Sequence, residues 1–186
     1  MYIQYEVADK IATITLDRPE AANAQNAGLL DELDAAWMRA AADPDVAVIV
    51  LRAEGKHFSA GHDLGTKVPP DDLKITLDLI YANESRRYLE YSLRWRNIPP
   101  KPSIAAVQGR CIAGGLLLCW PCDLIIASED ASFSDPVVLM GIGGGRIPRS
   151  HMGARTSQGQ GDPVHRTSGH RARSRADRDG QQGRAP

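Results

Sequence analysis

The sequence predicts an α/β domain followed by a segment of a different character. Continuous apolar and β-branched runs, such as residues 46–51, are typical of strands that are covered on both faces. Between these runs lie stretches whose apolar residues recur at helical spacing. Apolar residues make up 72 of residues 1–145 but only 7 of residues 146–186. The folded core is therefore expected over residues 1–144, with a tail over residues 145–186.

The first half of the core contains a strand pair, a helix and a third strand. Residues 2–8 and 10–16 are expected to pair through a turn at Asp9-Lys10. Residues 27–42 carry apolar side chains at helical spacing, and Asn26 is suited to cap this helix because its side chain accepts from free amides. A buried strand over 46–51 and a glycine-containing loop over 52–64 follow.

The second half repeats the alternation of helix and strand. One long or broken helix is expected over 71–97, then a strand over 104–107, a helix over 113–120 and two short strands over 124–127 and 131–134. The inward residues of the helix over 71–97 are expected to be Leu73, Leu77, Ile80 and Leu93. Repeated strand and helix units with short links between them indicate an α/β domain.

Composition excludes several classes of protein. No apolar run is long enough to cross a bilayer, and the first residues show no secretory signal. Three cysteines clustered at positions 111, 119 and 122 do not make a disulfide framework. We therefore expect a cytoplasmic protein without a transmembrane segment.

The tail differs from the core in charge as well as in hydropathy. Residues 1–145 hold 13 Lys and Arg against 20 Asp and Glu, a net charge of −7, whereas residues 146–186 hold 9 Arg and 3 Asp, a net charge of +6. Such a composition predicts disorder. Basicity supplied only by arginine suggests GC-rich DNA translated out of frame from Gly145 onward. The alternative is a basic tail that binds polyanions, without specificity for nucleic acid because it lacks aromatic side chains for base stacking.

Two glycine-containing loops, each after a predicted buried strand, are the main candidates for a site. Gly114 and Gly115 lead into a helix whose first amides have no intrahelical partner. The amides of Ala60 and Gly114 are therefore candidates to converge on one oxygen as an oxyanion hole. The same glycines are also compatible with two tight turns and no site.

Three further motifs are interpreted as structural. Cys119 and Cys122 have the spacing of a redox pair but follow an apolar helix, where buried core thiols are expected. A zinc site lacks a well-spaced histidine. The glycines at 141–145 do not fit a nucleotide-binding pattern.

Several ordered motifs together resemble the crotonase (enoyl-CoA hydratase/isomerase) superfamily. The resemblance runs from the opening strands to about residue 144, through 16–24 (LDRPEAANA), 48–51 (VIVL), 58–64 (FSAGHDL), 101–109 (KPSIAAVQG), 113–115 (AGG), 122–127 (CDLIIA) and 133–136 (FSDP). It implies a crotonase-like ββα spiral core, truncated before the C-terminal helical region that forms trimers. Among members, the chain is most similar to mycobacterial proteins that bind long-chain fatty acyl-CoA without catalysis and serve mycolic-acid lipid metabolism.

The resemblance implies an acyl-CoA thioester as the ligand and no other cofactor or metal. The amides of Ala60 and Gly114 would hold the thioester oxygen. Backbone at two segments would line the coenzyme A side; these residues are Glu20, Ala21 and Ala22, and Ala60, Gly61, His62 and Asp63. For the full-length family a homotrimer or hexamer is expected.

The acid–base pair of the family's hydratases is missing from this sequence. Leu117 and Val137 stand where the resemblance places the two glutamates, and neither transfers a proton. Our first hypothesis is therefore acyl-CoA binding without hydration. The second is a hydratase or isomerase that uses another acid, with Asp135 as the nearest candidate, and the third is polyanion binding by the tail. His62 is interpreted as a polar loop residue.

Overall fold

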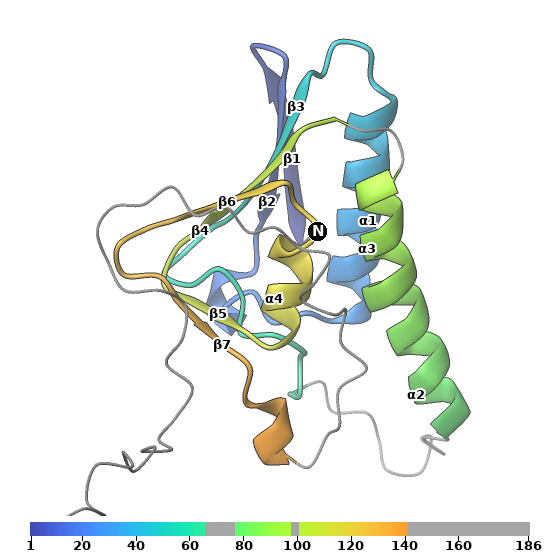
Figure 1. Ribbon diagram of the computed structural model, residues 1–186, viewed down its shortest axis with the longest axis vertical. Coiled ribbons are helices and arrows are strands. Elements are labelled where there is room, and N and C mark those ends of the chain that lie inside the picture. Colours follow the sequence, from blue (N-terminus) through green and yellow to red (C-terminus); the bar gives the residue numbers. More distant parts are fainter. Residues whose placement is uncertain (66–76, 98–100, 141–186) are drawn as a thin grey trace, which may run out of the picture.

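A five-stranded sheet forms the centre of the fold, with helices α1, α2 and α3 along one side (Figure 1). The computed structural model describes residues 1–65, 77–97 and 101–140. The strand order is β1-β2-β3-β4-β6, in which β1 is antiparallel to β2 and every later neighbour is parallel. The bounds are β1 Ile3–Ala8, β2 Ile11–Leu16, β3 Val48–Ala53, β4 Ser103–Val107 and β6 Leu124–Ala127. The predicted α/β class is confirmed.

Helix α1 (Ala27–Ala42) begins and ends where the sequence predicts. The Asn26 side chain accepts a hydrogen bond from the Leu29 amide at 2.8 Å, which satisfies one of the four free donors of the first turn. Farther along the helix, Glu32 accepts from the Tyr2 amide at 2.6 Å and thereby connects α1 to the first strand. The cap prediction is confirmed.

The second helical segment is broken, and one of its predicted inward residues faces outward. Helix α2 (Leu77–Glu84) continues through a turn of π-helix, η2 (Ser85–Glu90), into α3 (Tyr91–Asn97). Tyr91 and Trp95 form the buried stripe at helical spacing, and Trp95 stacks on Trp37 of α1 at 5.0 Å between ring centroids. Leu93 lies two residues from each of them, on the opposite side of the helix, and is 45% exposed. Its predicted inward position is therefore wrong. Leu73 lies outside the described residues, as do the side chains of Leu77 and Ile80.

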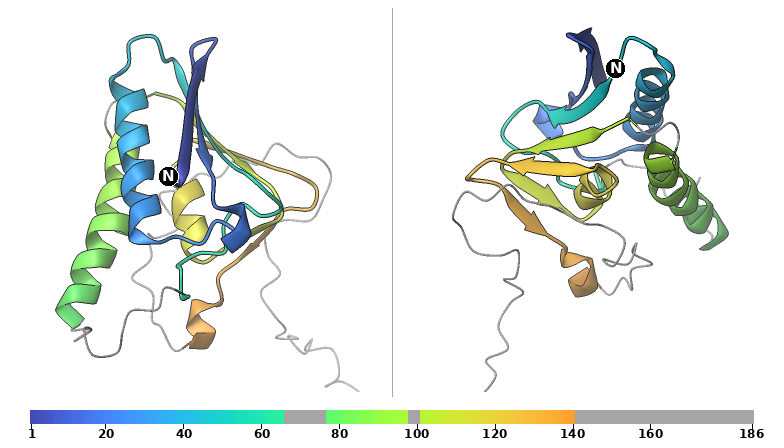
Figure 2. Two further views of the ribbon diagram at one scale, coloured as in Figure 1. Left: turned by 180° about the vertical axis from the view of Figure 1, so that it is seen from behind. Right: turned by 45° about the horizontal axis from the view of Figure 1, so that its top comes forward.

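A second, two-stranded sheet contains one predicted strand, over 131–134, and one strand that the sequence prediction missed. Strand β5 (Arg110–Ile112) pairs in parallel with β7 (Ser132–Ser134), and helix α4 (Gly114–Cys119) follows directly after β5. Two short 3₁₀ turns, η1 (Pro19–Ala21) and η3 (Pro136–Met140), were also not predicted. Viewed from two further directions, β7 and η3 extend away from the five-stranded sheet (Figure 2).

The core fills the space between the sheet and the helices. Its largest fully buried apolar side chains are Ile14, Leu16, Leu29, Leu30, Leu33, Trp37, Ile49, Leu51, Phe58 and Leu118. All three cysteines are buried and free, as predicted, and burial raises the pKa of the Cys122 thiol well above its ordinary value. Cys119 and Cys122 are therefore buried thiols of the core, the position that the sequence predicts for them.

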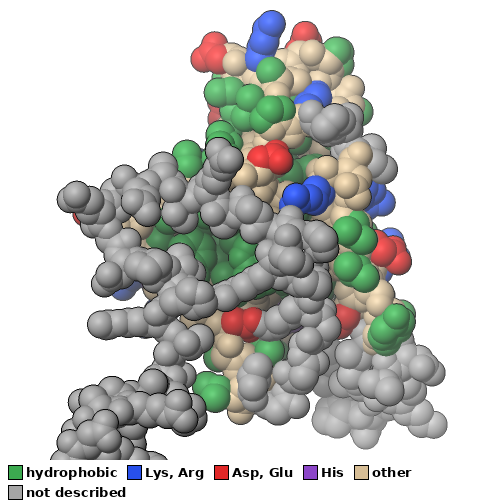
Figure 3. All heavy atoms as spheres, in the orientation of Figure 1, with side chains coloured by type: hydrophobic (Ala, Val, Ile, Leu, Met, Phe, Trp, Pro, Cys, Tyr) green, Lys and Arg blue, Asp and Glu red, His purple; other side chains and the backbone are tan. Residues whose placement is uncertain are grey.

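Hydrophobic side chains also gather on one face, over the region where β6 and α4 lie (Figure 3). On the edge strand β6, Leu124 is 42% exposed and Ile126 is 50% exposed.

Among the helices that the structure describes, none has the length and apolar character needed to cross a membrane.

Candidate functional site

The candidate site lies where the loops after three parallel strands meet. The carboxyl ends of β2, β3 and β4 lie at one edge of the sheet, which is the usual place for ligands in open α/β sheets. Two isolated bridges join the loops there: Gln25 pairs with His62, and Ser59 pairs with Cys111. Segments far apart in sequence are thereby held as one surface.

Asn23 fastens the loop after β2 to the loop after β3. Its side chain is fully buried and donates to the carbonyl oxygens of Glu54 and His57, both at 2.9 Å. Its amide oxygen accepts from the Arg18 amide at 2.8 Å. With three hydrogen bonds, Asn23 fixes the chain next to the predicted coenzyme A segment.

Gln25 and Ser59 form a second buried polar layer beneath this edge. The Ser59 hydroxyl donates to the Asn23 carbonyl at 2.8 Å and accepts from the Gln25 side-chain amide at 3.1 Å and from the Gly61 amide at 3.2 Å. Because Ser59 gives its proton to Asn23, the Gln25 nitrogen must face Ser59. The Gln25 Oε1 atom is then directed away from Ser59, toward Gly114, and within the described residues this buried oxygen accepts no hydrogen bond.

Gly61 and Gly114 approach each other more closely than residues with side chains allow. Gly61 has φ +90°, and a Cβ there would lie 2.8 Å from the Ile112 carbonyl oxygen and 3.2 Å from the Gly114 nitrogen. A Cβ on Gly114 would lie 2.5 Å from Gln25 Oε1 and 2.9 Å from His62 Nδ1. Both positions therefore require glycine, and the two loops come together as the sequence predicts.

Ala113, immediately before α4, adopts φ +47°, a conformation that L side chains rarely take. Its amide donates to the Ser134 carbonyl on β7 at 2.9 Å, which holds the turn in place. This strained residue directs the chain so that Gly114 begins α4 beside His62. As the first residue of a helix, Gly114 has an amide without an intrahelical acceptor.

The Ala60 amide is not available for a ligand, which corrects our prediction for this residue. It donates to the Ala22 carbonyl at 2.9 Å and so joins the loop after β3 to the loop after β2. Within the described residues, the amide of His62 donates to no backbone carbonyl. In this loop His62 therefore has an amide without a backbone acceptor, two residues further along the chain than Ala60.

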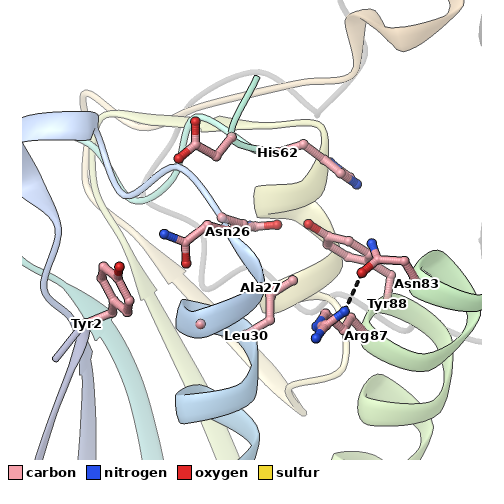
Figure 4. A pocket seen from close by; sticks show the side chains of 11 residues that line it. Tyr2, Asn26, Ala27, Leu30, His62, Asn83, Arg87 and Tyr88 are labelled. Atoms are coloured by element: carbon pink, nitrogen blue, oxygen red, sulfur yellow. Dashed lines mark hydrogen bonds between the residues drawn. The ribbon is translucent and has the colours of Figure 1, made fainter. Parts of the chain in front are cut away.

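The His62 ring extends from its loop toward the helical segment and lines a cavity of about 440 Å³ (Figure 4). Its Nε2 atom lies 3.2 Å from Glu84 Oε2, and its ring stacks on Tyr88 with centroids 4.3 Å apart. Burial raises the pKa of the Tyr88 phenol, which therefore stays neutral. The cavity is lined by Tyr2, Gln25, Asn26, Ala27, Gly28, Leu30, His62, Asp63, Asn83, Arg87 and Tyr88.

The predicted coenzyme A segments lie side by side at this edge. Glu20 is exposed, and Ala21 and Ala22 end the 3₁₀ turn η1. Asp63 is bound to Arg18 by an ion pair of 2.5 Å, and its amide donates to the Gln25 carbonyl. The two segments named in the sequence prediction are thus brought together, with the side chain of Asp63 used to hold them.

The two positions at which the resemblance places the hydratase glutamates carry apolar side chains that are half-buried. Leu117 is half-buried on α4 and packs against the core, and Val137 is half-buried in η3. Asp135 is half-buried just before η3. Among the residues that the structure describes, no group of three or more His, Cys, Asp or Glu side chains is arranged to hold a metal ion.

Several residues of the site gave no sequence signal on their own. Asn23 lies in the motif over 16–24, which indicates the family but not the role of this side chain. The burial of Gln25 and Ser59 could not be predicted, because polar residues in loops are ordinarily exposed. Glu84 and Tyr88 reach the site because the helical segment folds back across the cavity, which local sequence does not reveal.

The site is thus part of an α/β sheet protein in which two glycine-containing loops, one with Gly61 and one with Gly114, meet at the carboxyl ends of parallel strands. The enoyl-CoA hydratase/isomerase family model matches residues 6–150, and the chain belongs to this family. It is 46% identical over 154 residues to the putative enoyl-CoA hydratase EchA13 of Mycobacterium tuberculosis, an alignment that covers 73% of this chain and 48% of that protein.

Solved structures show the same likeness. A probable enoyl-CoA hydratase from Mycobacterium thermoresistibile is 78% identical with a TM-score of 0.70, over 77% of this chain and 56% of that one. The probable enoyl-CoA hydratase from Mycobacterium smegmatis is 73% identical with a TM-score of 0.71, over 77% and 55%. The crotonase-like core is thereby confirmed, and the chain spans about half the length of the relatives it matches.

Proposed function

We propose that this chain binds a fatty acyl-CoA thioester without hydrating it. The observation that carries the proposal is the junction of Gly61, His62 and Gly114, where the start of α4 meets the loop after β3 beside a cavity of about 440 Å³. The amides of Gly114 and His62 would polarise the thioester oxygen. The loops over 20–22 and 60–63 would contact coenzyme A.

The absence of hydration follows from the side chains at two positions. A hydratase must position and deprotonate a water molecule, which requires a group that transfers protons. Leu117 and Val137 carry only hydrocarbon. The alternative is a hydratase or isomerase in which Asp135 is the acid, because this carboxyl lies two residues from Val137.

We include in the proposal a role in fatty-acid or mycolic-acid lipid metabolism; the relatives, which are named as enoyl-CoA hydratases, support the acyl-CoA part of it. The family's homotrimer or hexamer is proposed for the full-length protein. Polyanion binding by residues 145–186 remains the third candidate, and it rests on their net charge, since these residues lie outside the described part of the chain.

The test is a calorimetric titration with straight-chain acyl-CoA of increasing length. Each buried methylene contributes about 0.8 kcal/mol, or about fourfold in affinity, until the cavity is full. Affinity that does not change with length, or no binding by the folded protein, contradicts the proposal.

The absorbance of an enoyl-CoA thioester tests hydration directly, because hydration removes the conjugated double bond. We expect no loss of absorbance from the unmodified chain. A loss that disappears in Asp135→Asn would establish the alternative enzyme.

A further inference from the structure

His62, Glu84 and Tyr88 form a cluster of titratable side chains at the cavity that the binding proposal does not use. His62 comes from the loop after β3, whereas Glu84 ends α2 and Tyr88 lies in the π-helical turn η2. Irregular π turns inside helices occur frequently at functional sites. The cluster therefore joins two parts of the fold beside the start of α4.

The hydrogen bond to Glu84 determines which nitrogen of His62 carries the proton. A carboxylate only accepts, so His62 Nε2, at 3.2 Å from Glu84 Oε2, must be the donor. In the neutral imidazole the other nitrogen, Nδ1, then carries a free lone pair. Nδ1 is the nitrogen that faces Gly114, since it lies 2.9 Å from the point where a Cβ on that glycine would stand.

The orientation of the ring is fixed from three directions. Tyr88 stacks on one face with an interplanar angle of 23°. The backbone on both sides of His62 is paired with Gln25, through the Gly61 carbonyl at 2.7 Å and the Asp63 amide at 3.0 Å. An imidazole held in this way is preorganised for proton transfer to or from a ligand at the Gly114 amide.

We infer that His62, oriented by Glu84, exchanges a proton at the carbon next to the thioester carbonyl of a bound acyl-CoA; this inference rests on the proposed function. The carbon–hydrogen bond breaks and its proton binds to Nδ1. The electron pair moves onto the thioester oxygen, where the amide of Gly114 stabilises the enolate. The imidazolium is stabilised by Glu84, a positioning residue, and return of the proton to the carbon regenerates the acyl-CoA.

This step needs neither the missing glutamates nor an activated water. What it adds is the base: proton transfer at the carbon next to the thioester carbonyl is assigned to His62, positioned by Glu84. Hydration stays absent, because no group is assigned to deliver water to the neighbouring carbon.

The experiment places the full chain in D₂O with saturating octanoyl-CoA and follows deuterium in the acyl chain by mass spectrometry. We expect incorporation faster than in buffer alone. His62→Gln should lower the rate constant at saturation by about 100-fold or more, the usual contribution of a general base. His57→Gln is the matched control: His57 accepts from the Arg110 amide at 3.2 Å, is not among the residues that line the cavity, and should leave the exchange rate unchanged.

Two further variants separate proton transfer from a structural role. In His62→Ala, added imidazole should restore exchange, which an effect on folding would not allow. Glu84→Gln should lower the rate constant at saturation by about tenfold or more, because the carboxylate orients the imidazole and stabilises the imidazolium, with the half-saturating concentration unchanged.

The outcomes that overturn the inference differ from those that overturn the binding proposal. Binding of octanoyl-CoA in calorimetry without deuterium incorporation refutes the inference and leaves the binding proposal intact. Exchange that persists in His62→Gln but is lost in Asp135→Asn assigns the proton transfer to Asp135 and also refutes it. Absence of binding refutes both proposals.

Discussion

Gly114 is closely surrounded by other residues of the site. Its Cα is enclosed by the Gln25 side chain on one side and the His62 ring on the other, and Gly61 approaches its amide from a third direction. Hydrogen bonds from Gln25 to Ser59 and between His62 and Glu84 oppose movement of these two side chains away from Gly114. A substitution at Gly114 therefore tests whether stability and ligand binding require the close approach of the loops that carry Gly61 and Gly114.

Gly114→Ala should both destabilise the protein and weaken acyl-CoA binding. The new Cβ would stand 2.5 Å from Gln25 Oε1, and overpacking of this kind costs about 1–3 kcal/mol. Urea unfolding and calorimetry measure the two effects. Gly65→Ala serves as the control because Gly65 is exposed and a Cβ there meets its nearest neighbour at 3.4 Å, an ordinary contact. Equal stability of the two variants would contradict the prediction.

At the scale of the site residues, the sequence predicts which loops meet but not which amides are free. The prediction that Gly114 lies at the start of a helix, next to the loop after β3, agrees with the structure. The assignment of Ala60 fails because its amide pairs with Ala22, a contact between segments 38 positions apart that no local pattern encodes. Buried polar residues such as Gln25 and Ser59 are equally invisible, since a polar side chain in a loop is ordinarily exposed.

Elements were predicted well where one local rule decides them. Helix α1 was located correctly because the spacing of its apolar residues and the Asn26 cap give the same bounds. Strand β5 was missed because three residues carry no period, and its partner β7 is distant in sequence. The π turn between α2 and α3 depends on packing across the cavity, so the inward stripe of this segment could not be located from spacing.

Asn26→Ala should destabilise α1 by about 1 kcal/mol, the usual cost of losing a side-chain cap. The Leu29 amide, now bonded to the Asn26 side chain at 2.8 Å, would lose its acceptor. Thermal and urea unfolding followed by circular dichroism measure the change. Asn97→Ala, an exposed asparagine at the end of α3, is expected to stay within about 0.5 kcal/mol of the parent protein.

The contact between α1 and η2 should depend on pH. Asp31 accepts from Arg87 Nε at 3.0 Å and Nη2 at 2.9 Å, and the hydrogen bond from Arg87 lowers the pKa of this carboxyl below its ordinary value. Because the pKa is lower in the folded state, the stabilisation is complete above the ordinary aspartate range, about pH 4, and is lost as the pH falls through the folded value.

Asp31→Asn should accordingly lower the free energy of unfolding at pH 7 by about 1 kcal/mol or less, as for other partly exposed ion pairs. The difference from the parent protein should shrink as the pH falls below about 4. Urea unfolding at a series of pH values measures it. A difference that stays constant down to pH 2 would show that the pair does not titrate as described.

At the scale of the whole molecule, the acidic core and the basic tail offer two different modes of binding to a phosphate-containing ligand. Attraction of coenzyme A phosphates to the arginines of residues 146–186 would weaken steeply with salt and would not depend on the acyl chain. Binding at the cavity depends on the acyl chain, because apolar burial supplies its free energy. Salt concentration and acyl-chain length therefore distinguish the two modes: salt weakens binding by the tail, and shortening the acyl chain weakens binding at the cavity.

Long-chain acyl-CoA should raise the stability of the chain, whereas free coenzyme A should have little effect. A ligand that binds only the folded state at 100 times its dissociation constant adds about 2.7 kcal/mol to the free energy of unfolding. Thermal unfolding with each ligand, at low and at moderate salt, measures the difference. Stabilisation by acyl-CoA that survives moderate salt is the expected result, because burial of the acyl chain and not attraction between charges would then supply the binding free energy. Equal, salt-sensitive effects of the two ligands would assign binding to the basic tail and contradict the proposed function.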